Sequence, residues 1–436
     1  MADYREFFAG KRITLMGLGL LGRGVGDAEF LAPLCRELFV TDKKTAEELG
    51  ASIERLKQFS NIRYTLGEHK EKDFTETDMV IKAAGVPLDA PEIAAAKKAG
   101  VPVYMSTALF AKFAREAGAV LVGVTGTRGK TTTAALMYYT LKVAGKRVHL
   151  GGNVRGLSTL AMIGDVQAGD IVVLELDSWQ LQGFGDLQLS PDIAVFTNLM
   201  PDHLNYYGGD MEKYFWDKAQ IFTHQKTGNK LVAGAQIVAK IQQVHPPVAP
   251  LVPPPLPPQW QLRIVGEHNR ENASCAALAL RMLGLQDDDI RNGLETFEAV
   301  EGRLQFVREM KGVKIYNDNN ATTPEATCAA LSSFKPVQTI VIAGGSDKNL
   351  PLETLAARMK ECKKVLLLAG GGTDKLQTLL PNALLYQDME KAVQDAYAAA
   401  VPGDVLLFSP GFASFGIFRN EYDRNDQFMA AVGALE

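Results

Sequence analysis

The sequence predicts an α/β protein of three domains, each built around a largely parallel sheet. Three observations support this fold class. Short apolar runs typical of buried strands alternate with helical stretches along most of the chain. Two glycine-rich turns, one at Gly17 and one at Gly126, each follow such a run and precede a helical stretch. The 436 residues also suffice for several domains of roughly 100–200 residues each.

Composition and charge are those of an ordinary soluble globular protein, with 47% hydrophobic and 22% charged residues and a net charge of −4. No block of like charges indicates a nucleic-acid or membrane surface. The first residues are too charged for a secretory signal, and no apolar run approaches the roughly 20 residues of a membrane helix. The four cysteines form no CxxC pair, which argues against a zinc site or disulfides and fits a reducing cytoplasm.

The first block, residues 1–117, opens with an apolar strand followed by a GxGxxG turn made of Gly17, Gly19 and Gly22. Asp42 follows the next strand-like run. Glycines at such a turn let backbone N–H groups approach a diphosphate, and an acidic residue can accept a hydrogen bond from a ribose hydroxyl. A nicotinamide dinucleotide, another nucleotide diphosphate such as a sugar nucleotide, and a purely structural turn all remain open at this point.

The second block, residues 118–300, carries a phosphate loop between an apolar strand and a helix. The loop consists of Gly126, Thr127, Arg128, Gly129, Lys130, Thr131 and Thr132. It departs from the general GxxxxGK[ST] pattern because Val124 stands where the first glycine is usual. Backbone amides would surround the phosphates, Lys130 would neutralise their oxygens, and the Thr131 hydroxyl would bind Mg²⁺. A glycine turn with a surface lysine is disfavoured, because strand, loop and helix come in the required order.

Polar residues also stand near the expected ends of two further strands in this block. Glu175 ends one strand, and its carboxylate could ligate a hard cation. Asp202 and His203 follow another strand, at the sheet edge where open parallel sheets bind ligands. Either would be an ordinary loop residue if it stood alone, but their position downstream of a phosphate loop favours a metal site. Lys218, judged by its pattern alone, is a surface lysine on a helix.

Residues 245–260 contain eight prolines and predict extended, polyproline-like chain. Their PxxP spacings could bind an SH3-type groove, but a stiff loop inside the second domain is the favoured interpretation. The third block, residues 301–436, shows four strand–loop–helix units. Within it, Thr323 and Pro324 predict an N-cap and a first helical turn, whose free N–H groups would favour a bound carboxylate.

Taken in order along nearly the whole chain, these motifs resemble the Mur ligase family, the ATP-dependent amide-forming ligases of peptidoglycan precursor synthesis. The resemblance rests on GTRGKTTT, GGN, LELDSWQL, TNLMPDHL, KYFWDKAQIF, GEHNRENASCAALA, YNDNNATTPEA and SPGFASFGIF. It implies a Rossmann-like N-terminal domain over 1–117, a central P-loop ATPase domain over 118–300, and a Rossmann-like C-terminal domain over 301–436.

The resemblance also implies a role for each matching residue. The UDP-substrate would be bound by Gly17, Gly19, Leu20, Leu21, Gly22, Asp42, Gly85, Asn153 and Gln180. ATP would be bound by the phosphate loop together with Asn269, Asn272, Arg303 and Asp318. The metal would be held by Thr131, Glu175, His203 and a carbamylated Lys218, and the catalytic residues would be Lys130, His203 and Lys218. The added amino acid would be bound by Thr322, Lys348, Ser414 and Glu421.

The implied reaction joins D-glutamate to UDP-N-acetylmuramoyl-L-alanine through an acyl phosphate, with ATP and two Mg²⁺ ions. A cytoplasmic monomer is implied, with small-molecule substrates and neither nucleic acid nor membrane as partner.

Three positions depart from the family pattern, since Asn320 replaces a usual lysine, Glu421 a usual aromatic residue, and Asp177 a small hydroxyl residue. L-glutamate or another amino acid is therefore an alternative substrate. A folylpolyglutamate-type ligase is disfavoured by the N-terminal GxGxxG block. A catalytically weakened nucleotide-binding scaffold is disfavoured by retention of the phosphate-loop and metal residues.

Overall fold

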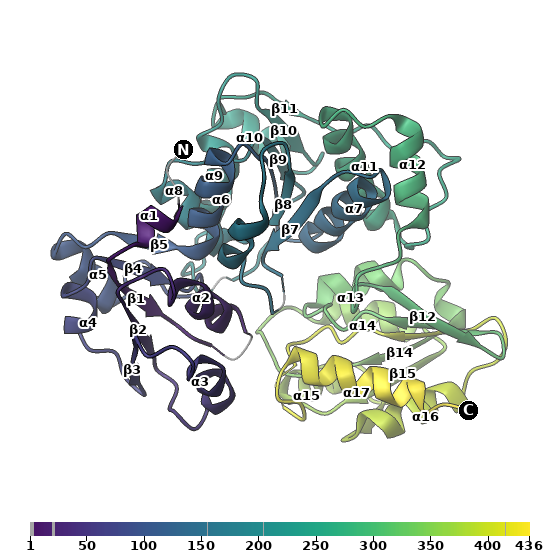
Figure 1. Cartoon of the computed structure of the whole chain (residues 1–436). Helices are drawn as coiled ribbons and strands as arrows, with labels where there is room; N and C mark the ends of the chain where they lie inside the picture. Colours follow the sequence, from purple (N-terminus) through teal and green to yellow (C-terminus); the bar gives the residue numbers. More distant parts are fainter. Residues whose placement is uncertain (1–3, 20–21, 155, 204, 415) are drawn as a thin grey trace. The chain divides into compact units, whose positions relative to one another are not determined.

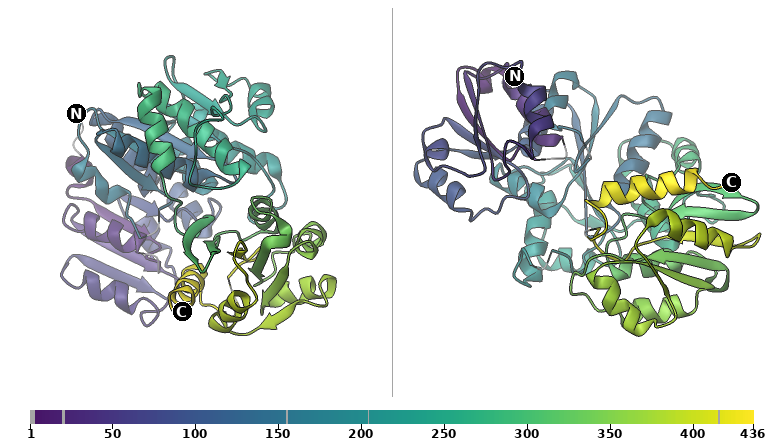
Figure 2. Two further views of the ribbon diagram at one scale, coloured as in Figure 1. Left: turned by 90° about the vertical axis from the view of Figure 1, so that its right-hand side faces the viewer. Right: turned by 90° about the horizontal axis from the view of Figure 1, so that it is seen from below.

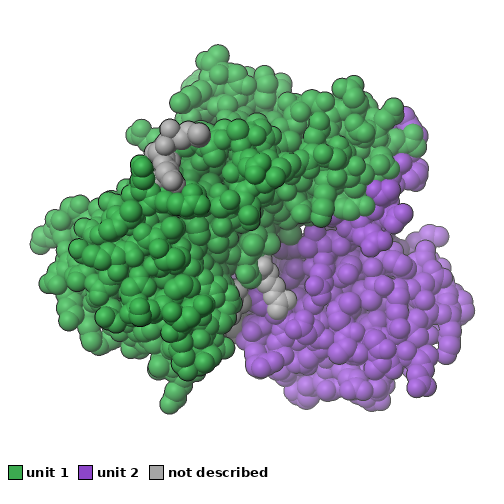
Figure 3. All heavy atoms as spheres, viewed as in Figure 1, with its two compact units in different colours: residues 1–254, 274–293 green, residues 255–273, 294–436 purple. Residues whose placement is uncertain are grey.

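The computed structural model describes residues 4–19, 22–154, 156–203, 205–414 and 416–436 (Figure 1). The chain divides into two compact units (Figure 3). Unit 1 comprises Met1–Pro254 and Ser274–Gly293, and unit 2 comprises Pro255–Ala273 and Leu294–Glu436. Among the described residues unit 1 holds two sheets and unit 2 holds one, which confirms the α/β fold class. The domain boundaries expected at residues 117 and 300 stay a prediction.

The first sheet of unit 1 is parallel throughout, with strand order β3-β2-β1-β4-β5. Its strands are β1 (Arg12–Met16), β2 (Glu37–Asp42), β3 (Ile62–Leu66), β4 (Met79–Lys82) and β5 (Val103–Met105). Its helices are α1 (Tyr4–Phe8), α2 (Arg23–Leu31), α3 (Gly50–Leu56), α4 (Lys72–Thr75), α5 (Pro91–Lys98) and α6 (Ser106–Glu116). Alternate strand residues pack against α2 and α6 on one face and against α4 and α5 on the other, as in a doubly wound sheet.

The second sheet has the order β11-β10-β9-β6-β8-β7 and is also parallel. Its strands are β6 (Val120–Thr125), β7 (Val148–Gly152), β8 (Ile171–Glu175), β9 (Ile193–Phe196), β10 (Lys230–Ala233) and β11 (Pro250–Leu251). Helix α7 (Lys130–Val143) contacts β6, β7 and β8, while α8 (Ser178–Asp186) and α9 (Met211–Thr223) share a core with α6. That shared core joins the two sheets into one unit.

The remaining elements of the middle region are a 3-10 helix, η1 (Leu160–Asp165), and the helices α10 (Val238–Gln243), α11 (Glu267–Met282) and α12 (Asp287–Thr296). Helix α11 crosses from unit 2 into unit 1 at Ala273.

The proline-rich segment does more than form a loop. Two of its residues make β11, the edge strand that pairs with β10, and an edge is a position where a sheet tolerates proline. The border between the two units then falls at Pro254–Pro255, inside the same segment. The expectation of extended chain is therefore confirmed, but the segment is also the place where unit 1 gives way to unit 2.

The sheet of unit 2 has the order β12-β13-β17-β14-β15-β16. Figure 2 shows this unit, coloured green to yellow, from two further sides. Its strands are β12 (Gln305–Met310), β13 (Val313–Asn317), β14 (Thr339–Ala343), β15 (Lys364–Leu368), β16 (Leu384–Tyr386) and β17 (Val405–Phe408). Its helices are α13 (Pro324–Leu331), α14 (Glu353–Lys360), α15 (Gly371–Leu379), α16 (Met389–Ala398) and α17 (Glu421–Gly433), with the short η2 (Pro336–Gln338).

Helices α16 and α17 cover one face of this sheet, and α13, α14 and α15 cover the other. The β12–β13 pair is antiparallel, and the alternation of strands and helices did not predict this pair.

Candidate active site

The phosphate loop connects the end of β6 to the start of α7. Gly126 and Gly129 both have positive φ, 145° and 83°, and Gly129 is the N-cap of α7. A Cβ atom on Gly126 would lie 2.0 Å from the Thr197 hydroxyl, so only glycine fits there. The expected strand–loop–helix arrangement is present, with the N-terminus of a helix of 14 residues at the loop.

The loop is held in shape by the segment that follows β9. The Thr127 N–H donates to the Asn198 carbonyl at 2.9 Å, and the Arg128 N–H donates to the Asn198 side-chain oxygen at 2.9 Å. The Thr197 hydroxyl donates to the Thr125 carbonyl at 3.2 Å. Sequence reasoning missed Thr197 and Asn198. Their signal was a polar Thr-Asn pair directly after a buried strand that lies next to β6.

Two lysines converge on the same carbonyl of the loop. The Lys130 ammonium donates to the Gly126 and Thr127 carbonyls at 3.0 and 3.1 Å, and the Lys218 amine donates to the Gly126 carbonyl at 2.9 Å. Lys218 is 1% exposed and lies 4.7 Å over the Tyr214 ring. Its interpretation as a surface lysine from pattern alone is therefore wrong. Burial, together with the nearby charge of Lys130, holds the pKa of Lys218 well below its usual range.

The predicted metal-binding residues lie at, or in the segments that follow, the carboxyl ends of three neighbouring strands, β8, β6 and β9. Glu175 is the last residue of β8, is 4% exposed, and stands opposite Val124 of β6. Thr131 is the second residue of α7. His203 has a positive φ of 53°, and burial lowers its pKa, so its imidazole is neutral at neutral pH and able to ligate a metal. Within the described part of the chain, no three His, Cys, Asp or Glu side chains form a metal-binding group.

Asp202 connects His203 to the phosphate loop. Its carboxylate lies 3.9 Å from the His203 Nε2 and 3.7 Å from an Arg128 guanidinium nitrogen. The His203 ring in turn packs on Trp179, with 4.7 Å between the ring centroids.

Asp177, one of the three departures, has a structural role. Its carboxylate accepts from the Gln180 N–H at 2.7 Å, and the Gln180 side-chain oxygen accepts from the Asp177 N–H at 3.2 Å. This capping box starts α8, so the aspartate does here what a small hydroxyl residue does at an N-cap. Gln180, expected to bind substrate, is further fixed by a 3.1 Å bond to the Thr107 hydroxyl. Asn153 lies beside Glu175, whose carbonyl accepts from the Asn153 N–H at 2.7 Å.

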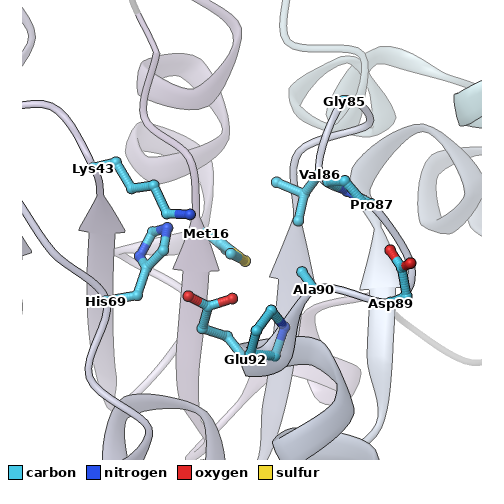
Figure 4. A pocket seen from close by; sticks show the side chains of 10 residues that line it. Met16, Lys43, His69, Gly85, Val86, Pro87, Asp89, Ala90 and Glu92 are labelled. Atoms are coloured by element: carbon cyan, nitrogen blue, oxygen red, sulfur yellow. The ribbon is translucent and has the colours of Figure 1, made fainter. Parts of the chain in front are cut away.

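The first sheet carries a cavity of about 430 Å³ at the carboxyl ends of its strands (Figure 4). Gly85 lines it together with Met16, Lys43, His69, Val86, Pro87, Asp89, Ala90, Pro91 and Glu92. Figure 4 shows the side chains of Lys43, His69 and Glu92 pointing toward one another across the pocket. Of the residues predicted to bind the UDP-substrate, Gly85 lines this cavity.

The GxGxxG turn has the expected backbone, because Gly17, Gly19 and Gly22 all have positive φ. Asp42 is engaged with that turn, since its carboxylate accepts from the N–H groups of Leu18 and Gly19 at 2.9 and 3.0 Å. Its structural role is thus to shape the turn. The expected contacts at Leu20 and Leu21 lie outside the described residues.

In unit 2, the residues predicted to bind the amino acid gather at the ends of three neighbouring strands. The Lys348 ammonium donates to the Thr322 hydroxyl at 3.2 Å. Ser414 is 3% exposed and follows Ala413, whose carbonyl accepts from the Ser346 N–H at 2.9 Å.

The two departures in this region have defined places. The Asn320 amide donates back to the Glu301 carbonyl at 3.4 Å. Glu421 offers its backbone carbonyl to the Asn319 amide at 2.9 Å.

Arg424 is a residue that sequence reasoning missed. It is fully buried, and its guanidinium donates to the Asn319 side chain at 2.9 Å, the Asn319 carbonyl at 2.8 Å and the Phe412 carbonyl at 3.1 Å. Burial lowers the pKa of Arg424 to about 10, while the Glu421 charge opposes that shift, so the guanidinium stays charged at neutral pH. It joins the two loops that carry Thr322 and Ser414. A lone arginine in a C-terminal helix gave no sequence signal of this role.

The residues predicted to reach ATP from outside the phosphate loop all belong to unit 2. Asp318 accepts from the Leu304 N–H at 3.0 Å and from the Ser409 hydroxyl at 2.9 Å. Arg303 donates to the Asn320 carbonyl at 3.4 Å. Asn269 and Asn272, both in α11, hydrogen-bond to each other at 3.4 Å. These contacts order the residues in unit 2 and do not test their predicted role.

Among the described residues, no helix has the length and apolar character needed to cross a membrane. The cysteines are free thiols, with Cys35 and Cys275 buried and Cys328 and Cys362 partly exposed.

Three family models match the chain in succession. They are described as the Mur ligase MurD-like N-terminal domain over residues 11–105, the Mur ligase middle domain over 124–246, and the Mur ligase glutamate ligase domain over 302–412. One model falls on each of the three sheets.

Two relatives that match nearly the full length of the chain carry the same name. A UDP-N-acetylmuramoylalanine–D-glutamate ligase of Roseiflexus sp. (strain RS-1) is 37% identical, covering 97% of this chain and 98% of the relative. A protein of the same name from Clostridium kluyveri is 32% identical over 99% of both chains.

Solved structures support the fold. The UDP-N-acetylmuramate-alanine ligase MurC of Thermotoga maritima covers 97% of this chain with a TM-score of 0.63 at 17% identity, and is itself covered to 99%. The MurF ligase of the same organism in complex with ADP covers 92%, with 96% of its own chain matched, a TM-score of 0.59 and 20% identity. The match to E. coli FolC in complex with ADP spans only 76% of this chain and 93% of the FolC chain, with a TM-score of 0.52 and 18% identity.

Proposed function

Because this chain belongs to the Mur ligase family, we propose that it is an ATP-dependent ligase that joins D-glutamate to UDP-N-acetylmuramoyl-L-alanine. The relatives with this name span the whole chain at 32–37% identity. The structural observation that supports the proposal is the phosphate loop with Lys130 at its centre. The FolC-type alternative is disfavoured, because FolC matches only about three quarters of the chain.

The reaction follows from what such a site stabilises. The alanyl carboxylate oxygen attacks the γ-phosphorus of ATP, ADP leaves, and an acyl phosphate forms. The amine of D-glutamate then attacks the acyl carbon, a proton leaves the nitrogen, and inorganic phosphate departs as the amide forms. Lys130 lies where it would offset charge on the phosphate oxygens during the first step. The acyl phosphate must be kept from water, which would hydrolyse it.

Thr131, Glu175 and His203 fit a magnesium site at this edge of the sheet. Hydroxyl and carboxylate oxygens are ligands that Mg²⁺ prefers, and Mg²⁺ usually takes only one or two carboxylates, with water and substrate phosphates completing its shell. The lowered pKa of His203 keeps its ring nitrogen available. When bound, Mg²⁺ supplies positive charge to the transferred phosphoryl group. We propose up to two such ions.

Lys218 could join these ligands only in a modified form, because an ammonium cannot bind a cation. The neutral amine can attack CO₂, forming a carbamate and releasing a proton. Its depressed pKa favours that neutral amine. The Lys218 nitrogen already lies 2.9 Å from the Gly126 carbonyl, so a carbamate there would stand at the phosphate loop. These facts support carbamylation of Lys218.

We assign the two other substrates to the residues expected to bind them. The cavity lined by Gly85, with the adjoining GxGxxG turn, Asn153 and Gln180, would hold the UDP-substrate. Thr322, Lys348 and Ser414 would bind the two carboxylates of glutamate, with Lys348 as the cation. We place the reaction in the cytoplasm, in peptidoglycan precursor synthesis, and expect a monomer.

The test is ATP-dependent phosphate release with UDP-N-acetylmuramoyl-L-alanine, with D-glutamate, L-glutamate and other amino acids added one at a time. Product mass is determined for each. We expect release with D-glutamate and a product heavier by one glutamyl residue. Release with a different amino acid alone would keep the ligase chemistry and refute the choice of D-glutamate. No release with any amino acid, in a chain that still binds ATP, would refute the ligase and favour the scaffold alternative.

A further inference from the structure

The loop between β4 and α5 forms one wall of the cavity in the first sheet. Gly85, Val86, Pro87, Asp89 and Ala90 of this loop all line the cavity, and Figure 4 shows them along one side of it. We call residues 83–90 the β4–α5 loop. The conformation of the loop determines the shape of that wall. Side chains that hydrogen-bond to the loop therefore influence how a ligand binds in the cavity.

Lys82 holds the loop at its start. It is 2% exposed, and its ammonium donates to the Val86 carbonyl at 2.8 Å. Burial lowers the pKa of Lys82 to about 8, and the charge of Lys97 in α5 acts in the same direction. The opposing effect comes from three carboxylates of the second sheet's helices, Asp186, Asp177 and Asp217. The charge of Lys82 is therefore felt by acidic residues of α8 and α9.

Tyr206 holds the loop further along. Its hydroxyl accepts a hydrogen bond from the Leu88 backbone. Burial raises the tyrosine pKa most, and the charges of Asp217 and of Asp89 in the loop act in the same direction. The same hydroxyl accepts from the Gln182 amide at 3.2 Å. That amide also donates to the Asp217 carboxylate at 2.7 Å. Tyr206 thus stands between the β4–α5 loop and α9.

Two short routes continue from Tyr206 to the phosphate loop. Along the chain of α9, Asp217 is followed by Lys218, whose amine donates to the Gly126 carbonyl at 2.9 Å. Through ring packing, Tyr206 contacts Trp179 with 5.3 Å between centroids, and Trp179 contacts His203 at 4.7 Å. All of these residues belong to unit 1, and the links are hydrogen bonds, ring contacts and one step along the chain from Asp217 to Lys218. Packed and hydrogen-bonded networks of this kind can carry coupling between two sites.

We propose that Tyr206 is a positioning residue that couples occupancy of the β4–α5 cavity to nucleotide binding at the phosphate loop. The inference rests on the proposed function, because it takes the cavity to hold part of the UDP-substrate and the loop to hold ATP. A UDP-substrate that orders the β4–α5 loop would order Tyr206, Gln182 and Asp217 with it. The phosphate loop would then bind ATP more tightly, and the coupling would be reciprocal.

The test is the dissociation constant of the Mg²⁺ complex of AMP-PCP, measured by calorimetry with and without saturating UDP-N-acetylmuramoyl-L-alanine. We expect the wild-type chain to bind the analogue about 5-fold or more tightly in the presence of the UDP-substrate. Tyr206→Phe keeps the ring on Trp179 and removes only the hydroxyl. We expect it to bind each ligand alone within about 2-fold of wild type and to lose the coupling. Tyr64→Phe, which removes a hydroxyl from the partly exposed strand β3, should keep the coupling.

The possible outcomes distinguish a failure of the proposed function from a failure of the proposed coupling. A wild-type chain that binds the analogue but not the UDP-substrate would overturn the proposed function and this inference with it. A wild-type chain that binds both ligands independently, or a Tyr206→Phe chain that keeps the full coupling, would overturn the inference alone. If the hydroxyl had only a structural role, Tyr206→Phe would bind each ligand more weakly. The ratio of the AMP-PCP dissociation constants without and with the UDP-substrate would then stay as in the wild type, which also contradicts the inference.

Discussion

Lys130 is a single charge on which the proposed phosphoryl transfer depends. Its ammonium lies 3.0 and 3.1 Å from the Gly126 and Thr127 carbonyls, inside the loop that would surround the phosphates. We expect Lys130→Ala to lower kcat for ligation by roughly 100- to 1000-fold, because a preorganised charge at the developing transition state is lost. Phosphate release and the unfolding transition are measured together. A folded variant that keeps more than a tenth of wild-type ligation would refute the phosphate-loop assignment.

The proposed carbamylation of Lys218, which would turn a buried amine into an anion, can be tested by substitution. We expect Lys218→Ala to be nearly inactive and to recover part of its activity when formate or acetate is added, because a small carboxylate can replace the carbamate. Lys213→Ala, on the same helix but with a 74% exposed side chain, is the matched control and should keep its activity. Full activity of Lys218→Ala without added carboxylate would show that the lysine has no part in the reaction.

At the residue scale, the sequence was most informative where chemistry and local backbone coincide. Glycines in a phosphate-loop pattern indicate a tight turn by themselves, so the turn at Gly126 and Gly129 could be predicted without a structure. Lys218 could not, because its burial depends on the packing of α9 against the loop, and helical spacing alone gave it an exposed position. Arg424 and Asn198 act through contacts with residues far away in sequence, which no local pattern encodes.

At the element scale, the alternation of apolar runs and helices predicted parallel sheets correctly, since βαβ units bury their strands on both faces. The antiparallel β12–β13 hairpin, which has a two-residue turn, was missed. Lys311 and Gly312 both have positive φ, 48° and 80°, as a type I′ turn requires. A lysine in the first position hid a turn that asparagine or aspartate would have shown.

Asp27 links two elements of unit 1, because its carboxylate in α2 accepts from the Ser158 hydroxyl, two residues before η1, at 2.5 Å. Burial raises its pKa to about 6 from 3.8. The folded chain therefore holds this proton more tightly than the unfolded chain between about pH 4 and pH 6. Stability from this group is present below pH 4 and is lost as the pH rises through 6.

We expect Asp27→Asn to remove this dependence and to keep an oxygen that can accept from Ser158. Relative to wild type, the variant should gain about 3 kcal/mol in the free energy of unfolding between pH 4 and pH 7, at 1.36 kcal/mol per pKa unit. Urea unfolding of both chains at four pH values in this range measures the difference. A difference that stays constant from pH 4 to pH 7 would show that Asp27 titrates normally.

At the scale of the whole molecule, the order of the three sheets was predictable but the division into units was not. Residues 255–273 belong to unit 2, and the chain then re-enters unit 1 through α11. Such a crossing depends on which surfaces pack together, and composition gave no sign of it beyond the prolines at the border. The consequence is that the phosphate loop and the residues predicted to bind the amino acid fall in different units. The phosphate loop lies wholly in unit 1, and the Thr322–Lys348 pair lies wholly in unit 2.

We therefore expect the two units to respond to different ligands during thermal unfolding. The Mg²⁺ complex of AMP-PCP at 100 times its dissociation constant should stabilise unit 1 by about 2.7 kcal/mol, and D-glutamate should stabilise only unit 2. Differential scanning calorimetry with each ligand alone resolves the two transitions. Lys130→Ala should abolish the first shift, and Lys348→Ala the second. If D-glutamate shifted the transition of unit 1 instead, Thr322 and Lys348 would not be its binding residues, and the amino-acid pocket would have to be sought beside the phosphate loop.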